Sequence, residues 1–223
     1  MLYTESVKKQ YDKYVVFNGV SIEIPSCSFV SLTGKNGIGK TTLLNILAGL
    51  IDFEGNCYID NISLKDNYTE YMSKTSYIPS HPFLYDFLSL SEMKAMIESN
   101  LVDKDIRLNK RLERLIEELQ MQKYFNTISK NLSLGTKQKA ALLLGFLSTP
   151  QVVLLDEPFA NLDKESFSSM VNFLEDYVND YKAIVVFANH SHYNSHLGEI
   201  ITKELSIQSE NKVLVYDMVC NES

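Results

Sequence analysis

A glycine-rich segment at residues 34–41 combines the residue types that bind phosphate. Its sequence, Gly34-Lys35-Asn36-Gly37-Ile38-Gly39-Lys40-Thr41, fits the pattern G-x4-G-K-[ST]. Glycines let backbone N–H groups turn toward phosphate oxygens, and the N-terminus of a following helix favours anions. Lys40 is expected to reach the β- and γ-phosphates of a nucleotide, and the Thr41 hydroxyl to bind Mg²⁺. The nucleotide-binding residues predicted here are Gly34, Asn36, Gly37, Gly39, Lys40, Thr41 and Thr42.

Two carboxylates follow an uninterrupted apolar run at residues 152–155. They are Asp156 and Glu157. Beside a phosphate loop, an Asp that ends a buried strand holds Mg²⁺, commonly through water. Glu157 would then stand next to the γ-phosphate and act as general base toward the attacking water. The alternative, a strand that simply ends in solvated acids, is common but is disfavoured by the phosphate loop in the same chain.

The elements expected to position these groups alternate along the chain. Residues 29–33 form a strand that runs into the glycine-rich turn, and apolar residues recur at helical spacing from Thr41 onward. A strand, a glycine turn and a helix open an α/β nucleotide-binding fold. Other strands are predicted at residues 20–24, 56–62, 76–78, 152–155 and 183–188, with a closing hairpin between 199–207 and 212–219.

The stretch from Ser91 to about Tyr124 has a different, helical pattern. One apolar stripe is formed by Leu108, Leu112, Leu115, Ile116 and Leu119, while charged residues fill the other face. We therefore predict a helical insert outside the sheet.

A third motif resembles a known family. Ser133-Leu134-Gly135-Thr136-Lys137-Gln138-Lys139 is similar to the signature motif of ABC ATPases. In that family the signature serine and glycine grip the γ-phosphate of ATP bound to the opposite subunit, so the resemblance implies this role for Ser133 and Gly135. Ser133 also suits the N-cap of an ordinary helix, which is the alternative interpretation.

Further landmarks follow the family order. Asp163 matches the family's D-loop, which crosses the dimer interface, and it also suits a helix N-cap. His190 matches the switch histidine that contacts the γ-phosphate. Tyr11 matches the aromatic residue that stacks on adenine, with Tyr14 as a rival. The resemblance thus extends from Tyr11 to His190 and implies ATP and Mg²⁺ as cofactors.

The chain departs from the family pattern at three positions. Ser80 stands where the family has a glutamine that touches Mg²⁺ and the attacking water. A serine is shorter by two heavy atoms, so we keep Ser80 as a metal ligand but expect weakened hydrolysis and coupling. In the signature motif, Leu134 replaces a glycine and Thr136 a glutamine.

Histidines and cysteines indicate no further site. His190, His192 and His196 lie close in sequence, but no carboxylate or cysteine joins them in a recognised metal spacing. Cys27, Cys57 and Cys220 are far apart and odd in number, so we expect buried, reduced thiols and no disulfide framework.

Composition limits the partners. The formal net charge is −7, so binding to nucleic acid is not expected. The first residues do not have the pattern of a signal peptide, and the longest apolar run, residues 140–147, is too short to span a bilayer. A membrane function would therefore need a separate transmembrane subunit, with this chain in the cytoplasm at the inner face of the membrane.

The resemblance implies an α/β fold with a RecA-like P-loop core, an antiparallel β subdomain and a helical insert. We expect one domain over 1–223, with a core of about 1–81 and 148–223 and a helical subdomain of about 82–147. The expected function is ATP hydrolysis that drives a transmembrane permease, in a dimer with a second ATP-binding subunit, expected to be a homodimer. A soluble non-transport ABC ATPase, such as an iron–sulfur assembly or repair factor, is the alternative. A module that only binds ATP is disfavoured by Lys40, Asp156, Glu157 and His190.

Overall fold

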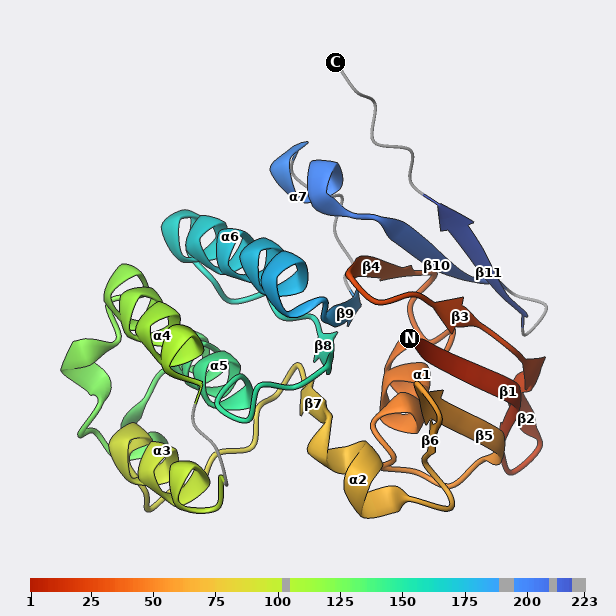
Figure 1. The fold of residues 1–223 in the computed structure, drawn as a ribbon, viewed down its shortest axis with the longest axis horizontal. Helices are drawn as coiled ribbons and strands as arrows, with labels where there is room; N and C mark the ends of the chain where they lie inside the picture. The colour runs from red at the N-terminus through yellow and green to blue at the C-terminus, as the bar shows by residue number, and fades with distance from the viewer. Residues whose placement is uncertain (102–104, 189–194, 209–211, 218–223) are drawn as a thin grey trace.

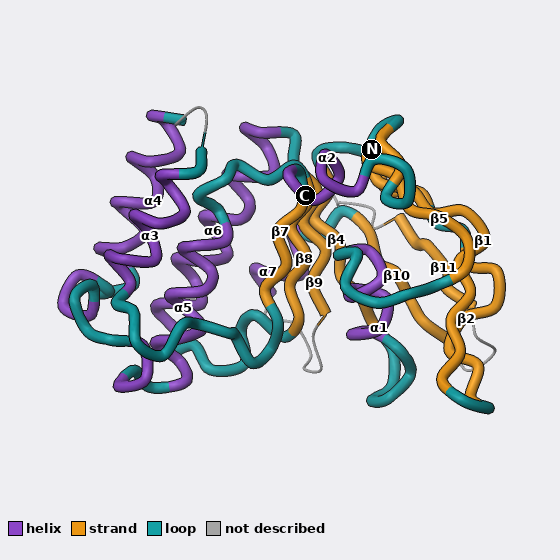
Figure 2. Tube along the Cα trace, turned by 90° about the horizontal axis from the view of Figure 1, so that it is seen from below, coloured by secondary structure: helices purple, strands orange, loops and turns teal. Residues whose placement is uncertain are grey.

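A central parallel sheet has a group of helices on one side, and a further helix and an antiparallel sheet on the other (Figure 1). This computed structural model describes residues 1–101, 105–188, 195–208 and 212–217. Seen from below, helices α3 to α6 gather beside β7, β8 and β9, and the antiparallel strands lie beyond α1 (Figure 2).

The central sheet has six strands in the order β11-β10-β4-β9-β8-β7. All neighbours pair in parallel except β10 and β11. Every residue of β8 and β9 is buried, as expected for strands covered on both faces. The strands are β4 (Ser28–Thr33), β7 (Thr75–Ile78), β8 (Val152–Asp156), β9 (Ile184–Ala188), β10 (Lys203–Gln208) and β11 (Lys212–Asp217).

A second, antiparallel sheet has the order β2-β1-β5-β6, with β3 also paired to β1. It supports the phosphate loop from one side, because β2 packs against Gly39 through Val16 and Phe17. Its strands are β1 (Leu2–Tyr11), β2 (Tyr14–Val20), β3 (Glu23–Ile24), β5 (Glu54–Ile59) and β6 (Ile62–Ser63).

Helices pack on the two faces of the parallel sheet and define two hydrophobic clusters. One cluster joins α1 to the antiparallel sheet, and the other joins α3, α4, α5 and α6 to the opposite face. The helices are α1 (Lys40–Leu47), α2 (Tyr68–Ser73), α3 (Leu90–Ser99), α4 (Ile106–Glu118), α5 (Leu134–Gly145), α6 (Lys164–Tyr181) and α7 (Ser195–Ile200). Short 3₁₀ turns occupy Gln122–Tyr124 and Ser129–Asn131.

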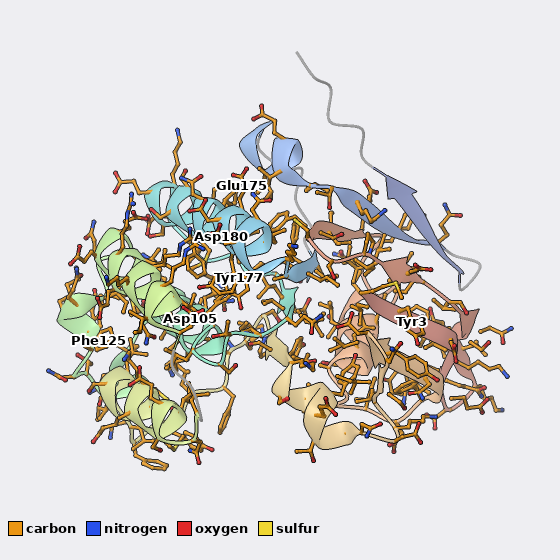
Figure 3. All side chains as sticks on the ribbon, in the orientation of Figure 1. Tyr3, Asp105, Phe125, Glu175, Tyr177 and Asp180 are labelled. Carbon is orange, nitrogen blue, oxygen red and sulfur yellow. The ribbon has the colours of Figure 1, made fainter. Side chains whose placement is uncertain are left out.

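The predicted helical insert is confirmed, and its apolar stripe faces inward. Leu108, Leu112 and Leu115 are each at most 3% exposed, and burial of a leucine contributes about 1.5–3 kcal/mol. The polar face of α4 is tied to α6 by ion pairs from Arg107 and Arg111 to Asp180. Figure 3 labels Asp180 on α6 and Asp105 at the start of α4.

Three strand predictions are wrong in their boundaries. The strand predicted at residues 20–24 is divided between β2 and β3, because the hydroxyl of Thr4 takes the N–H of Ile22 in place of a ladder partner. The strand predicted at 56–62 is a hairpin that turns at Asp60, where φ is 53°.

The third error is the hairpin strand predicted from residue 199. Residues up to Ile200 belong to α7, and β10 begins at Lys203. The helix ends at Ile200, and Ile201 follows it directly. This pair of isoleucines gives the same apolar signal as the start of a strand, so periodicity did not separate the two. Within the described residues, no helix has the length and apolar character needed to cross a membrane.

Candidate functional site

The phosphate loop lies between the end of β4 at Thr33 and the start of α1 at Lys40. Gly39 is the N-cap residue of α1, with φ of 120°, a conformation that L side chains rarely adopt. A Cβ atom on Gly39 would lie 2.7 Å from Cγ1 of Val16, so the loop and β2 are in contact there. Both the conformation and the close approach require glycine.

Lys40 is held inside the loop that precedes it. Its side chain is buried, and Nζ donates hydrogen bonds to the carbonyls of Gly34 (2.8 Å) and Lys35 (3.2 Å). Burial lowers the pKa of Lys40, while Glu157 and Asp156 oppose that effect. The lysine ammonium and the two carboxylates therefore lie close enough to interact electrostatically.

Thr41 and Asp156 meet across the site. The Thr41 hydroxyl donates a hydrogen bond of 2.8 Å to Oδ2 of Asp156, which is only 4% exposed. A hydroxyl and a carboxylate side by side are hard oxygen ligands of the kind that Mg²⁺ selects. The residues present therefore fit a Mg²⁺ site in chemistry and in proximity.

Glu157 follows β8 in an unusual backbone conformation. Its φ is 52°, and its N–H donates to the carbonyl of Ala188 at the end of β9 (2.9 Å). The left-handed region is uncommon for a non-glycine residue and costs backbone strain. Nearby, burial and then the charge of Asp156 raise the pKa of Tyr77 to about 12, so this phenol stays neutral.

The two candidate aromatic residues for adenine face each other at the tip of one hairpin. Tyr11 ends β1, Tyr14 begins β2, and the two are paired residues in the ladder. Tyr11 is 47% and Tyr14 58% exposed, and the ammonium of Lys9 lies 4.7 Å from the centroid of the Tyr11 ring. Because Val16 of the same hairpin touches Gly39, both rings lie on the element that flanks the phosphate loop.

The signature motif begins α5. Ser133 is the N-cap residue, and its hydroxyl accepts a hydrogen bond from the N–H of Thr136 (3.2 Å). A Cβ atom on Gly135 would lie 2.7 Å from the carbonyl oxygen of Asn161, so Gly135 permits close contact with the segment after Glu157. The capped-helix interpretation of Ser133 is therefore correct, and it is compatible with phosphate binding.

Asp163 is the N-cap residue of α6, as the alternative interpretation expected. Its Oδ1 accepts from the N–H of Ser166 (2.9 Å), and its Oδ2 accepts from Nζ of Lys139 (2.9 Å). Sequence reasoning missed Lys139. The available signal was a basic residue one helical turn after Gly135, which is the spacing that keeps both on one face of α5.

Ser80 and His190 are the remaining candidate residues. The Ser80 hydroxyl lies 3.3 Å from Nδ1 of His81, directly after β7. His190 and His192 fall outside the described residues, so the switch role of His190 stays a prediction, as does the expectation that the histidines form no metal site.

An apolar patch lies at the junction between the parallel sheet and the helical insert. Phe83, Tyr85 and Phe87 are 79%, 42% and 72% exposed. The ring centroid of Tyr85 lies 5.5 Å from that of Phe83 and 5.9 Å from that of Phe87. Beside them is a cavity of ≈ 250 Å³ between the segment after β7, α3 and α5, whose lining includes Tyr77, Ile78, Leu84, Met93, Met96 and Leu144.

Comparisons with known proteins agree with this geometry. The family model described as "ABC transporter" matches residues 17–160. Human ATP-binding cassette sub-family A member 10 is 33% identical over 77% of this chain, which spans 12% of that protein. The ABC-type transporter ATP-binding protein EcsA of Bacillus subtilis is 30% identical over 72% of this chain, which spans 66% of EcsA.

A solved structure has the same fold. It is a dimeric ATP-binding cassette in a post-hydrolysis state, bound to ADP and Pi, with a TM-score of 0.81 and 22% identity over 98% of this chain and 99% of that one. The predicted α/β class, with a parallel core sheet and an antiparallel β subdomain, is thereby confirmed.

Proposed function

Since this chain belongs to the ATP-binding proteins of ABC transporters, a family of ATPases that hydrolyse ATP for transport, we propose that its residues bind and hydrolyse ATP·Mg²⁺ to drive a separate permease. The observation that carries the proposal is the shared site of Lys40, the Thr41–Asp156 hydrogen bond and Glu157. The names of the relatives favour transport over the non-transport alternative.

Each group has a distinct task in the proposed reaction. The N–H groups of the loop and the Lys40 ammonium hold the phosphates, and Thr41 and Asp156 hold Mg²⁺, with Ser80 as a further ligand. The metal would neutralise charge on the phosphate oxygens. Glu157 accepts a proton from the attacking water, and His190 contacts the γ-phosphate. Tyr11 stacks on the adenine ring.

A second ATP-binding subunit completes the site. α1, which follows the phosphate loop, and α5, which carries Ser133 and Gly135, pack on opposite faces of the parallel sheet. This separation supports the proposal that Ser133 and Gly135 act on ATP held by the partner in a homodimer, with Asp163 near the interface. The dimeric cassette with the same fold supports it too.

The permease is proposed to contact the patch of Phe83, Tyr85 and Phe87 and the adjoining cavity. Aromatic rings this exposed and this close together are uncommon on monomer surfaces and mark interaction sites. They lie shortly after Ser80 in the chain, so binding of the permease there could change the position of Ser80 in the nucleotide site. We propose a peripheral location at the inner face of the cell membrane and one domain, 1–223, with its helical subdomain at 82–147.

Glu157→Gln tests the catalytic assignment. This variant should bind ATP like the wild type, hydrolyse it at least about a hundredfold more slowly and accumulate an ATP-stabilised dimer, because the amide keeps the shape but loses the base. Glu165→Gln, at the exposed start of α6, is the matched control. An active Glu157→Gln, or one that binds ATP but stays monomeric by size exclusion, contradicts the assignment.

Cross-linking tests the permease assignment. A photoreactive residue in place of Tyr85 should capture a transmembrane protein in native membranes, and one in place of the exposed Tyr68 on α2 should not. Capture of soluble proteins alone from Tyr85 would overturn it.

A further inference from the structure

Two contacts join the signature helix to the segment that follows Glu157. At the first turn of α5, Gly135 approaches the carbonyl of Asn161 so closely that a Cβ atom would lie 2.7 Å away. One turn later, Nζ of Lys139 lies 2.9 Å from Oδ2 of Asp163. The Lys139 side chain is only 15% exposed, so the ammonium is directed at the segment and not into solvent.

The hydrogen bonds that Asp163 accepts favour its ionised form. Its carboxylate accepts hydrogen bonds from the N–H and the hydroxyl of Ser166 and from Lys139. The backbone N–H of Ser166, and then Lys139, hold the pKa of Asp163 well below its usual range. The carboxylate of Asp163 is therefore held in its ionised form at the contact to α5.

The segment between Glu157 and Asp163 has little freedom of its own. Phe159 is 8% exposed and packs against Phe167 and Phe187. The N–H of Ala160 donates to Glu157 and the N–H of Leu162 donates to Phe159, each at 3.3 Å. These hydrogen bonds close two turns, at 157–160 and at 159–162, that share residues. A displacement of Asp163 should therefore also move Glu157, whose φ is 52°.

We propose that Lys139 is a positioning residue for ATP hydrolysis. Through Asp163 it fixes the position of residues 158–163, and so of Glu157, relative to the helix that carries Ser133 and Gly135. This role rests on the proposed function. Partly exposed ion pairs contribute little to global stability, so the pair controls local geometry more than folding. A change in geometry of 1 Å or less at a catalytic group is enough to slow the reaction strongly.

The experiment compares four variants by steady-state ATPase, ATP binding without turnover and thermal unfolding. Lys139→Gln breaks the ion pair. Asp163→Asn breaks it too but keeps a side chain that caps helices well. Lys139→Arg keeps the charge, and Arg114→Gln removes an exposed ion pair to Glu118 on α4 as the matched control.

We expect kcat to fall about tenfold in Lys139→Gln and Asp163→Asn, with the Kd for ATP unchanged within about twofold. The melting temperatures should match that of Arg114→Gln, and Lys139→Arg should keep the wild-type kcat. An unchanged kcat in Lys139→Gln overturns the proposal. So does a parallel loss of kcat, ATP affinity and melting temperature, which is the pattern of a purely structural residue.

Amide hydrogen exchange provides a measurement that is independent of turnover. In Lys139→Gln the amides of Ala160 and Leu162 should exchange faster than in the wild type, and in Arg114→Gln they should not. Unchanged exchange in Lys139→Gln refutes the positioning role while leaving the proposed function intact. The proposed function has a separate test. If the wild type has no ATPase activity that depends on Glu157, the proposed function is refuted, and with it the role of Lys139 in hydrolysis, even where Lys139→Gln changes the exchange of Ala160 and Leu162.

Discussion

The hydroxyl of Thr41 donates a hydrogen bond of 2.8 Å to Oδ2 of Asp156. Thr41 lies in the first turn of α1 and Asp156 at the end of β8, so the bond connects two residues that are 115 positions apart in sequence. Each residue is the proposed Mg²⁺ ligand of its own motif, and the fold brings the two motifs together at this bond.

Thr41→Val should lower both stability and magnesium-dependent ATPase. The substitution removes the donor and leaves the buried Asp156 with one hydrogen bond fewer, at a cost of about 1–3 kcal/mol. A titration of ATPase with Mg²⁺ and urea unfolding measure the two effects. Thr41→Ser keeps the hydroxyl and should resemble the wild type. A Thr41→Val protein with wild-type magnesium dependence would exclude Thr41 from the metal site.

Ser80→Gln should raise the ATPase rate of the isolated subunit. A glutamine reaches two heavy atoms further than serine toward Mg²⁺ and the attacking water. Direct positioning in place of contact through water is worth about 1–2 kcal/mol of the barrier, or about tenfold in kcat. The measurement is kcat at saturating ATP and Mg²⁺, with Ser80→Asn, whose amide is shorter, as the control.

If Ser80→Gln leaves kcat unchanged or lower, then the serine at position 80 does not reduce the ATPase rate. The hydroxyl lies 3.3 Å from the ring of His81, and in that case the Ser80–His81 pair would itself be the working arrangement of this loop.

Gly135→Ala should destabilise the protein by about 1–3 kcal/mol, because its methyl group meets the backbone carbonyl of Asn161, which cannot rotate away. Gly198→Ala on α7 is the matched control, since its methyl group would meet nothing within 4 Å and alanine is the better helix former. Urea unfolding of both variants checks the difference. Equal stability of the two would mean that α5 shifts freely against the segment after Glu157.

The site motifs were predictable because each depends on residues that are adjacent in sequence. To recognise the G-x4-G-K-[ST] loop, it is enough to identify a strand before it and a helix after it, and for the apolar run before Asp156 it is enough to identify the strand itself and the loop after it. The contacts between motifs were not predictable. The approach of Gly39 to Val16 and the ion pair of Lys139 with Asp163 depend on how elements pack in space.

The errors in the fold have local physical causes as well. Asp60 adopts a left-handed conformation, and its N–H donates to the carbonyl of Met1, a partner that no short-range pattern reveals. The break between β2 and β3 depends likewise on the hydroxyl of Thr4, on another strand. Alternation of apolar residues identifies the strands but does not show where a distant group interrupts them.

The two described cysteines should differ in reactivity. The expectation that the cysteines are buried is wrong for Cys27, which is exposed, and correct for Cys57, which is fully buried in β5. Iodoacetamide at pH 8 should therefore modify Cys27 and leave Cys57 intact in the folded protein, while urea should make both reactive. Peptide mapping by mass spectrometry distinguishes them. Modification of folded Cys57 at a rate similar to Cys27 would contradict the buried position of β5.

Burial also makes Cys57 a source of alkaline instability. It raises the pKa of the Cys57 thiol from 9.0 to about 12. Between these values the unfolded chain has lost the thiol proton and the folded protein keeps it, so stability falls as pH rises. The contribution is fully present below pH 9 and is lost at up to about 1.4 kcal/mol per pH unit above it. Cys57→Ala lacks the thiol and should lose stability less steeply between pH 9 and 11. Parallel urea-unfolding curves for the two proteins across that range would contradict the raised pKa.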